Sequence, residues 1–379
     1  MKTKAAVLHQ IGNHARPYTD SKPLKIEEVT LREPGKEEVV VQIKAAGLCH
    51  SDLSVIDGNR PRQTPMVLGH EASGIIVKLG QDVKGFELGD HVVFAFLPSC
   101  GHCEYCVSGR AALCSEGAKA NNDGVLLNGT RKILNDKGQE YYHHLGVSGF
   151  AQHSVASIYS LVKIDKSYPF EIAALFGCAV MTGVGAVVHT AKIQAGESLL
   201  VVGLGGVGLS AILGAKATGA SKIIAADISE SKLAMAKDFG ATHTINSSNE
   251  NALNQLKNEI TTSGGVDKSV EFAGAMPALD FAFNATKKGG VTVTGALPHP
   301  EARLSLNPLT LVGQEKTLKG CYLGSCVPKI DIPNFLELYK NGNLPVDKLI
   351  THRLKLEDIN EGFERLASGQ AIRQIIVFD

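Results

Sequence analysis

The chain has 379 residues, of which 44% are hydrophobic and 20% are charged, so it can bury a sizeable core and wholesale disorder is excluded. At roughly 150 residues per domain, this length predicts two domains, or three. Lysine and arginine together number 38, as do aspartate and glutamate, and this balance gives no basic footprint for nucleic acid or for an acidic membrane.

Two uncharged stretches, 172–191 and 198–215, raise the question of membrane insertion. The first is long enough for a span, but it carries a cysteine, a histidine and two threonines, and the second carries five glycines. The apolar run behind the charged N-terminus, 5–8, is too short for a signal peptide. We therefore expect neither export nor membrane insertion, and we expect a cytoplasmic protein.

The part of the chain up to about residue 180 is rich in predicted strands. Runs of apolar and β-branched residues predict strands over 39–45, 74–78 and 91–94. Glycines and prolines lie between these runs and mark turns. We therefore expect a β-rich domain in this half of the chain.

The pattern changes near residue 199, where predicted strands begin to alternate with predicted helices. The strands are 199–203, 222–227, 268–272 and 291–294, and the helices are 206–218, 277–286 and a stretch that begins after Ser229 as N-cap and ends near 239. Alternation at this spacing predicts an α/β domain with a doubly wound parallel sheet of the Rossmann type. A mixed tail from about 323 ends in a predicted strand, 374–378.

A glycine-rich turn lies between the first of these strands and the helix after it. The segment Gly203-Leu204-Gly205-Gly206-Val207-Gly208 has the pattern G-x-G-x-x-G, and Asp227 ends the next strand, nineteen residues after Gly208. The context indicates a dinucleotide site, whereas the pattern alone would be weak, and a plain glycine turn with a surface aspartate is the alternative.

Each residue of this fingerprint has a physical role. Gly203 permits a tight turn, Gly205 lets the backbone approach a pyrophosphate at the helix N-terminus, and Gly208 brings helix and strand close together. Asp227 would accept hydrogen bonds from ribose hydroxyls and repel a 2′-phosphate. The predicted cofactor is therefore NAD rather than NADP.

Four of the eight cysteines, Cys100, Cys103, Cys106 and Cys114, lie within fifteen residues. Four thiolates suit a closed tetrahedral zinc site, which is structural rather than catalytic. A redox pair would need two cysteines, and an iron–sulfur cluster is the other alternative, against which the lack of a proline after Cys114 counts. The neutral charge of the chain disfavours a zinc module for nucleic acid.

Three short segments far apart in the chain supply a second candidate metal set. They are Cys49-His50-Ser51-Asp52, Gly69-His70-Glu71 and Gly177-Cys178. Cys49, His70 and Cys178 would give three protein ligands and leave a fourth position open, as in a catalytic zinc site. Asp52 is a candidate acceptor that fixes the tautomer of His70. Spacing does not show that these residues converge, and buried cysteines with an ordinary core histidine are the alternative.

Taken together, these motifs resemble the zinc-dependent alcohol dehydrogenases of the medium-chain dehydrogenase/reductase family. Gly69-His70-Glu71, with glycines at 74 and 80 and a valine at 83, matches that family's zinc signature, and the segments 143–146 and 368–373 resemble its liver-type and class III branches. The resemblance covers essentially the whole chain. It implies a discontinuous catalytic domain with a GroES-like β core, over 1–179 and 323–379, and a coenzyme domain over 180–322.

The resemblance also implies two zinc ions per chain. It assigns the catalytic zinc to Cys49, His70 and Cys178, with Glu71 close behind as an occasional alternative ligand, and the structural zinc to the four-cysteine cluster. Ser51 matches the hydroxyl that receives the alcohol proton. Ser54 stands where many members have the histidine that passes this proton to solvent, so proton release would use another route.

Further residues match the family's coenzyme and substrate sites. The coenzyme residues are His50 and Arg373 at the pyrophosphate, Asp227 and Lys232 at the ribose, and Thr182 and Val207 beside the nicotinamide. The residues at substrate-pocket positions are Ser54, Phe96, His144, Leu145 and Ala296.

The expected activity is zinc-dependent, reversible oxidation of medium-chain or aryl primary alcohols to aldehydes with NAD. The first alternative is the oxidation of S-(hydroxymethyl)glutathione, but Ala118 stands where that branch has an arginine, and 59–62, with the sequence Asn-Arg-Pro-Arg, replaces its acidic residues. The second is a non-catalytic structural member, which would have no reason to keep a complete zinc triad. The expected partner is a small alcohol or aldehyde, and the expected assembly is a homodimer, with a homotetramer as the alternative.

Overall fold

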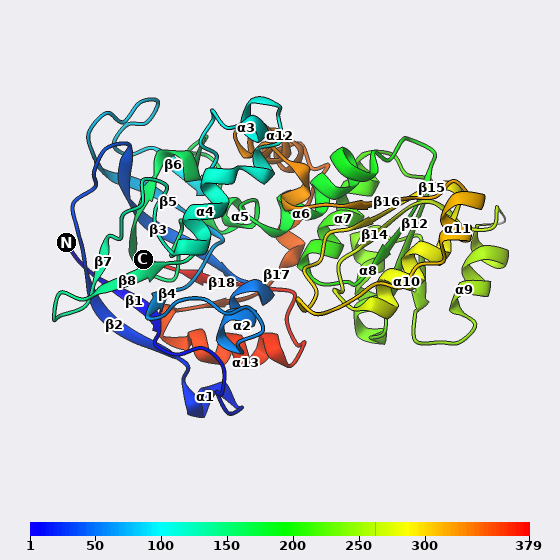
Figure 1. Ribbon diagram of the computed structural model, residues 1–379, viewed down its shortest axis with the longest axis horizontal. Coiled ribbons are helices and arrows are strands. Elements are labelled where there is room, and N and C mark those ends of the chain that lie inside the picture. The colour runs from blue at the N-terminus through cyan, green and yellow to red at the C-terminus, as the bar shows by residue number, and fades with distance from the viewer. Residues whose placement is uncertain (262) are drawn as a thin grey trace. The chain divides into compact units, whose positions relative to one another are not determined.

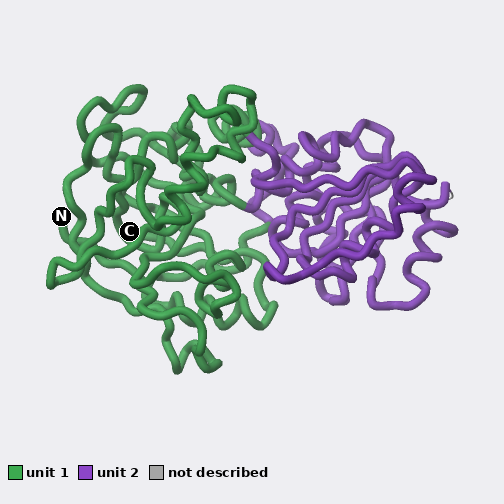
Figure 2. The backbone as a smooth tube through the Cα atoms, viewed as in Figure 1, with its two compact units in different colours: residues 1–178, 327–336, 349–379 green, residues 179–326, 337–348 purple. Residues whose placement is uncertain are grey.

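The computed structural model describes residues 1–261 and 263–379, which form two compact units (Figure 2). Unit 1 contains Met1–Cys178, Val327–Leu336 and Leu349–Asp379, and unit 2 contains Ala179–Cys326 and Glu337–Lys348. This division differs from the expected one, which placed all of 323–379 with the N-terminal domain. The segment 337–348 belongs to unit 2, where Lys348 Nζ donates to the carbonyl of Asp238 at 3.1 Å.

Unit 1 is built on a closed barrel and a larger sheet (Figure 1). The barrel has the order β1 (Lys2–Leu8), β2 (Leu24–Leu31), β7 (Ile133–Leu134), β8 (Glu140–His143) and β4 (Met66–Val67). The sheet has the order β10 (Leu161–Ile164), β6 (His91–Phe94), β5 (Ala72–Leu79), β3 (Glu38–Leu48), β18 (Arg373–Val377) and β17 (Ile350–Leu354), and β9 (His153–Ser157) also pairs with β3.

Helical segments connect these strands. They are α1 (Tyr18–Ser21), α2 (His50–Ile56), α3 (Glu104–Val107), η1 (Ala111–Leu113), α4 (Ser115–Asp123), η2 (Ile158–Ser160), α5 (Phe170–Leu175), η7 (Leu356–Asp358) and α13 (Ile359–Ala367). Helix α12 (Pro328–Lys340) and η6 (Val346–Leu349) each cross the division between the units. The antiparallel pairing of β18 with β3 makes unit 1 discontinuous, because it joins the C-terminal strand to the N-terminal half of the chain.

The strands predicted in this half are present. They are β3, β5 and β6. In the barrel, Val7 of β1, Val29 of β2, Val67 of β4 and Tyr141 of β8 belong to one buried apolar cluster. None of the barrel strands was predicted from the sequence, and two of them, β4 and β7, have two residues each.

Unit 2 is a six-stranded parallel sheet. Its order is β13 (His243–Asn246), β12 (Lys222–Asp227), β11 (Ser198–Val202), β14 (Val266–Glu271), β15 (Thr286–Thr294) and β16 (Thr317–Gly320). The helical segments are α6 (Ala179–Gly185), η3 (Ala186–Ala191), α7 (Gly206–Ala217), α8 (Glu230–Phe239), α9 (Ala252–Gln255), η4 (Leu256–Ile260), α10 (Met276–Ala285), α11 (Pro308–Gly313) and η5 (Leu323–Ser325). This is the strand order of a Rossmann fold, and it confirms the predicted class.

Both faces of this sheet are covered, which explains its nearly continuous apolar strands. On one face Leu200 and Ile224 belong to a buried cluster with Ala252 of α9 and Ala282 of α10. On the other face, α7 packs at Gly208 against Val201 of β11. Ser229 does occupy the N-cap position of α8, but its hydroxyl contacts Ser231 Oγ at 2.9 Å and caps no backbone N–H.

Among the described residues, no helix combines the length and the apolar character that crossing a membrane requires.

Candidate active site

Three side chains of metal-ligand type, from distant parts of the chain, meet in unit 1. The sulfur atoms of Cys49 and Cys178 and a ring nitrogen of His70 all lie within 4.8 Å of one another, and all three residues are buried. Cys49 is the N-cap of α2, His70 lies between β4 and β5, and Cys178 follows α5. The structure therefore brings together three residues whose convergence could not be predicted from their spacing in the sequence.

The orientation of His70 leaves one ring nitrogen for a metal. Its Nδ1 lies 3.0 Å from Oδ1 of Asp52, a fully buried carboxylate that also accepts from the backbone N–H groups of Cys49 and Gly69. Its Nε2 is buried and has no hydrogen-bond partner. Buried polar atoms are normally partnered, so an orphan imidazole nitrogen facing two thiols fits a metal ligand.

The mutual pKa shifts of the two thiols also indicate that a cation would bind between them. The neighbouring Cys178 thiol lowers the pKa of Cys49 well below its usual value, and Cys49 in turn raises the pKa of Cys178 well above its own. Two thiolates this close repel each other, so both ionise together only around a cation. The residues present therefore fit zinc, with two sulfur ligands and one nitrogen ligand.

Asp52 is shared between two histidines. Nδ1 of His144 lies 3.3 Å from the same Asp52 oxygen that meets His70, and the rings of the two histidines are perpendicular with centroids 5.7 Å apart. These three residues could also be grouped as a metal set, but the Asp52–His70 contact is a direct hydrogen bond, which leaves no room for an ion between them. Asp52 therefore holds the histidines rather than a metal.

Glu71 and Arg373 form a buried charged pair beside the trio. Glu71 fits only because residue 47 is glycine, since a Cβ there would lie 2.2 Å from Glu71 Oε1. Nη1 of Arg373 lies 3.8 Å from Glu71 Oε2 and donates to the carbonyl of Leu48 at 3.1 Å. Burial lowers the pKa of Arg373, but Glu71 and the cysteines outweigh it, so the guanidinium stays charged. The predicted contact of Arg373 with a pyrophosphate stays a prediction.

The other predicted catalytic-domain residues lie on α2 or around His70. His50 and Ser51 begin α2, and the Ser54 hydroxyl donates to the carbonyl of His50 at 2.9 Å. The Phe96 ring meets the His70 ring edge-on, with centroids 5.5 Å apart, so Phe96 and His144 flank this ligand. Leu145 is buried with a positive φ of 52°.

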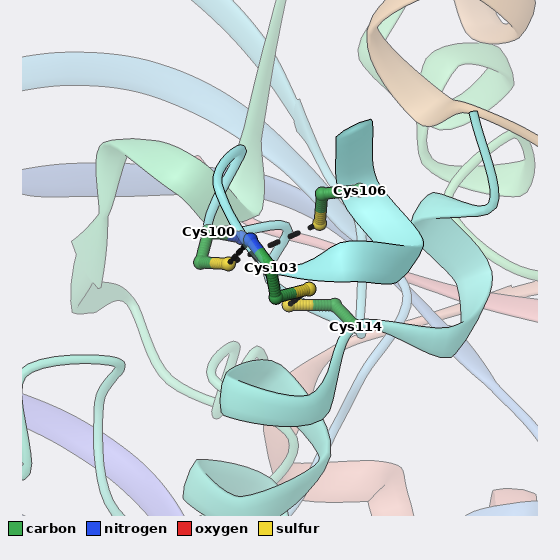
Figure 3. A group of neighbouring side chains, drawn as sticks. All are labelled: Cys100, Cys103, Cys106 and Cys114. Carbon is green, nitrogen blue, oxygen red and sulfur yellow. Dashed lines mark hydrogen bonds between the residues drawn. The ribbon is translucent and has the colours of Figure 1, made fainter. Parts of the chain in front are cut away.

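The four-cysteine cluster forms a separate site in unit 1, in which the sulfur atoms of Cys100, Cys103, Cys106 and Cys114 converge (Figure 3). The Cys100–Cys106 and Cys103–Cys114 sulfur pairs are 4.0 and 3.9 Å apart, and none of the four is in a disulfide. Zn–S bonds of about 2.3 Å in a tetrahedron put sulfurs about 3.8 Å apart, so the spacing fits zinc. Burial raises the pKa of Cys106 to about 12, so a cation is needed to hold all four as thiolates.

The glycine turn in unit 2 has the geometry that the fingerprint predicts. Gly203 has a φ of +89°, and a Cβ there would lie 2.6 Å from the backbone nitrogen of Ala273. A Cβ on Gly208 would lie 1.9 Å from the carbonyl oxygen of Gly203, so α7 packs directly on the turn and against Val201 of β11. A Cβ on Gly205 would meet no atom within 4 Å, which leaves the N-terminus of α7 open.

Asp227 ties this turn to β12. Its Oδ2 accepts from the backbone N–H of Leu204 at 2.8 Å, and its Oδ1 accepts from that of Ser229 at 3.0 Å. Carboxylate oxygens can accept more than one hydrogen bond, so these contacts leave capacity for ribose hydroxyls. The remaining predicted coenzyme-domain residues are all in unit 2: Thr182 on α6, Gly206 and Val207 on α7, Lys232 on α8, and Ala296 after β15.

Sequence reasoning missed one buried carboxylate at the same edge of the parallel sheet. Glu271, the last residue of β14, accepts from the backbone N–H of Gly274 at 2.6 Å and from Thr294 Oγ1 at 2.9 Å. It therefore links the loops that follow β14 and β15. The available signal was a glutamate that ends an otherwise apolar predicted strand.

Comparison with known proteins gives consistent results along the chain. A family model described as alcohol dehydrogenase GroES-like domain matches residues 35–166, and one described as zinc-binding dehydrogenase matches residues 206–341. The chain is 34% identical to an S-(hydroxymethyl)glutathione dehydrogenase from Paracoccus denitrificans, over 100% of both chains. It is 38% identical to an NDMA-dependent alcohol dehydrogenase from Amycolatopsis methanolica, over 100% of this chain and 99% of the relative. The crystal structure of benzyl alcohol dehydrogenase from Acinetobacter calcoaceticus covers 100% of both chains, with 33% identity and a TM-score of 0.92.

Proposed function

Since the chain belongs to the zinc-dependent alcohol dehydrogenases of the medium-chain dehydrogenase/reductase family, we propose that it oxidises medium-chain and aryl primary alcohols to aldehydes with NAD, and catalyses the reverse reduction. As a member it is an oxidoreductase that uses zinc and a nicotinamide coenzyme. The observation that carries the proposal is the buried trio of Cys49, His70 and Cys178, with an unpartnered His70 Nε2.

The residues of unit 1 would prepare the alcohol. Cys49, His70 and Cys178 would hold zinc and leave one position open, while Asp52 keeps the His70 proton on Nδ1. Bound zinc would supply a Lewis acid, which lowers the pKa of a bound water to about 7 and would lower that of a bound alcohol in the same way. The Ser51 hydroxyl at the start of α2 would receive the alcohol proton.

The residues of unit 2 would bind the coenzyme. The open N-terminus of α7 at Gly205 offers backbone N–H groups and a positive dipole end to the pyrophosphate. Asp227 would accept the ribose hydroxyls and repel a 2′-phosphate, with Lys232 beside it. The nicotinamide supplies the hydride acceptor, and Thr182 and Val207 would pack against it.

The substrate preference follows from the side chains at the predicted pocket positions. Phe96, Leu145 and Ala296 are apolar, and each buried CH₂ contributes about 0.8 kcal/mol. Benzyl alcohol and medium-chain alcohols should therefore be better substrates than ethanol. The second candidate, S-(hydroxymethyl)glutathione, is favoured by the name of the Paracoccus relative but not by the residues at Ala118 and 59–62.

An NAD-reduction assay over ethanol, hexanol, benzyl alcohol and S-(hydroxymethyl)glutathione tests the proposal. We expect the highest kcat/KM for benzyl alcohol or hexanol. Ethanol as the best substrate would overturn the apolar assignment, and S-(hydroxymethyl)glutathione as the best would establish the second candidate. Light scattering on the same preparation would distinguish the proposed homodimer from a homotetramer.

A further inference from the structure

Arg62, which has no role in the proposed mechanism, lies near the residues that flank His70. Arg62 follows α2 and precedes β4, in the segment 59–62 with the sequence Asn-Arg-Pro-Arg. Its Nη1 donates to the side-chain oxygen of Asn122 at 3.2 Å and contacts the backbone oxygen of Asn121 at 3.4 Å. Both residues belong to α4, so this helix holds the guanidinium in place.

Two contacts connect Arg62 to the residues that flank the metal ligand. Asn121, on which Arg62 rests, donates from Nδ2 to the carbonyl of Phe96 at 2.8 Å, and the Phe96 ring meets His70 edge-on. On the other flank is His144, whose ring is perpendicular to that of His70 with centroids 5.7 Å apart. Arg62 is therefore linked through Asn121 to Phe96, one of the two residues that flank His70.

The charge of Arg62 is not neutralised by the protein. Within residues 1–261 and 263–379, no carboxylate lies within ion-pair distance of Arg62, and both of its hydrogen bonds go to neutral amide oxygens through Nη1. Nε and Nη2 donate to no atom of the described residues, and they form a planar pair of donors. This fork matches the two oxygens of a carboxylate, and a half-buried guanidinium attracts an anion more strongly than one in bulk water does.

Resting on the proposed function, we propose that Arg62 is a specificity-determining residue, which selects primary alcohols and aldehydes that carry an anionic group, a carboxylate above all, at a distance from the reacting carbon. Phe96 and Leu145 would contact the apolar part of such a substrate, and Arg62 its charged end. Glutathione offers an ammonium group as well as carboxylates, and Arg60 and Arg62 disfavour that ammonium by repulsion.

The test compares acids with their neutral esters in the intact, zinc-loaded enzyme. The substrates are 3- and 4-(hydroxymethyl)benzoate and their methyl esters, assayed by NAD reduction at low and at high salt. We expect kcat/KM for at least one acid to exceed that of its ester by about fivefold at low salt, as for a partly exposed charge pair, and to lose most of this advantage at high salt.

Variants then locate the effect. Arg62→Gln should reduce the acid-to-ester ratio to about one, Arg62→Lys should retain part of it, and Arg110→Gln, which removes an exposed arginine elsewhere in unit 1, should leave the ratio unchanged. An unchanged ratio in Arg62→Gln, a loss that follows Arg60→Gln instead, or esters that exceed both acids would overturn the inference while alcohol oxidation itself stands. No oxidation of any acid or ester would overturn the proposed function together with the inference.

Discussion

At the scale of single residues, Asp227 combines a structural contact with a selective one. It holds the glycine turn through Leu204 N–H. In the proposed function its negative charge would also repel a 2′-phosphate. Asp227→Gly should therefore relax the preference for NAD over NADP by about 1–3 kcal/mol, the size of a lost set of charge-assisted hydrogen bonds. The measurement is the ratio of kcat/KM for the two coenzymes.

Asp227→Asn separates these two effects, because its amide oxygen can still accept from Leu204 while the charge is gone. It should relax the coenzyme preference with a smaller loss of thermal stability than Asp227→Gly. A wild-type enzyme that prefers NADP would contradict the assignment of Asp227 altogether.

Ser54 cannot serve as a base near neutral pH, and its hydroxyl is already donated to the carbonyl of His50. Ser54→His should raise alcohol oxidation below about pH 8 by up to ~100-fold, because a histidine can accept the proton there. The check is the pH–rate profile, with Ser54→Gln as a control of similar size that lacks a titrating group. A Ser54→His profile that overlays the wild-type profile would mean that proton release takes another route.

His143 makes the folded chain sensitive to acid. It is fully buried, its Nε2 accepts from the backbone N–H of Lys132, and burial lowers its pKa to about 3. An unfolded histidine titrates near pH 6.5, so below that pH the unfolded chain binds a proton that the folded chain excludes, and the free energy of unfolding falls with falling pH. Between pH 7.5 and pH 5 this residue should cost about 2 kcal/mol.

Denaturant titrations of wild-type protein and His143→Gln at both pH values measure this contribution. Glutamine can accept the same hydrogen bond without titrating, so the variant should lose less stability between pH 7.5 and pH 5, by about 2 kcal/mol. Equal losses in the two proteins would show that His143 is protonated at no cost in the folded state.

At the scale of elements, the four-cysteine cluster organises a segment with little regular structure. Helix α3 has four residues, η1 has three, and α4 begins at Ser115 directly after the last ligand. Such short elements are not stable alone, so bound metal should supply the folding free energy of this segment. Cys106→Ser should therefore lower the free energy of unfolding by about 3 kcal/mol or more.

Cys321→Ser is the matched control for this prediction, because Cys321 is buried but belongs to no metal set among the described residues. It should retain two zinc ions per chain by elemental analysis, whereas Cys106→Ser should retain one. A Cys106→Ser protein as stable as the control, or iron in place of zinc in the wild type, would contradict the structural zinc assignment.

The elements that could be predicted are those with a signal within a few residues. Helix α7 and strands β11 and β12 carry both a periodic pattern and the glycine turn between them, and they end within a residue or two of their predicted limits. Strands β4 and β7 have two residues each, and no periodicity exists over two residues. Their existence depends on partners distant in the chain, which local patterns do not encode.

The same distinction applies to the sites. The four cysteines of the structural site are close in sequence, so their spacing identifies them directly. Cys49, His70 and Cys178 are brought together by β3, β5 and α5. Their order along the chain could be read from the sequence, but their convergence in space could not be predicted from it. The sharing of Asp52 by two histidines and the room that Gly47 makes for Glu71 depend on packing, and no spacing indicates them.

At the scale of the whole molecule, the candidate metal ligands all lie in one unit, whereas most of the candidate coenzyme residues lie in the other. All seven candidate cysteine and histidine ligands belong to unit 1, and the glycine turn, Asp227 and Lys232 belong to unit 2. His50 and Arg373, which the resemblance places at the pyrophosphate, belong to unit 1. Each unit has its own sheet and its own buried cluster. A change confined to one set should therefore leave binding at the other set largely intact.

Two variants test this independence in opposite directions. Cys178→Ser should lose the catalytic zinc and abolish turnover, yet bind NAD with a Kd within about threefold of wild type, which is less than ~0.7 kcal/mol. Asp227→Gly should keep two zinc ions per chain while its affinity for NAD falls. Elemental analysis and a fluorescence titration with NAD on both proteins provide the four values. If Cys178→Ser also lost NAD binding by more than about tenfold, coenzyme affinity would depend on the metal site, and the assignment of the two sets to separate tasks would be wrong.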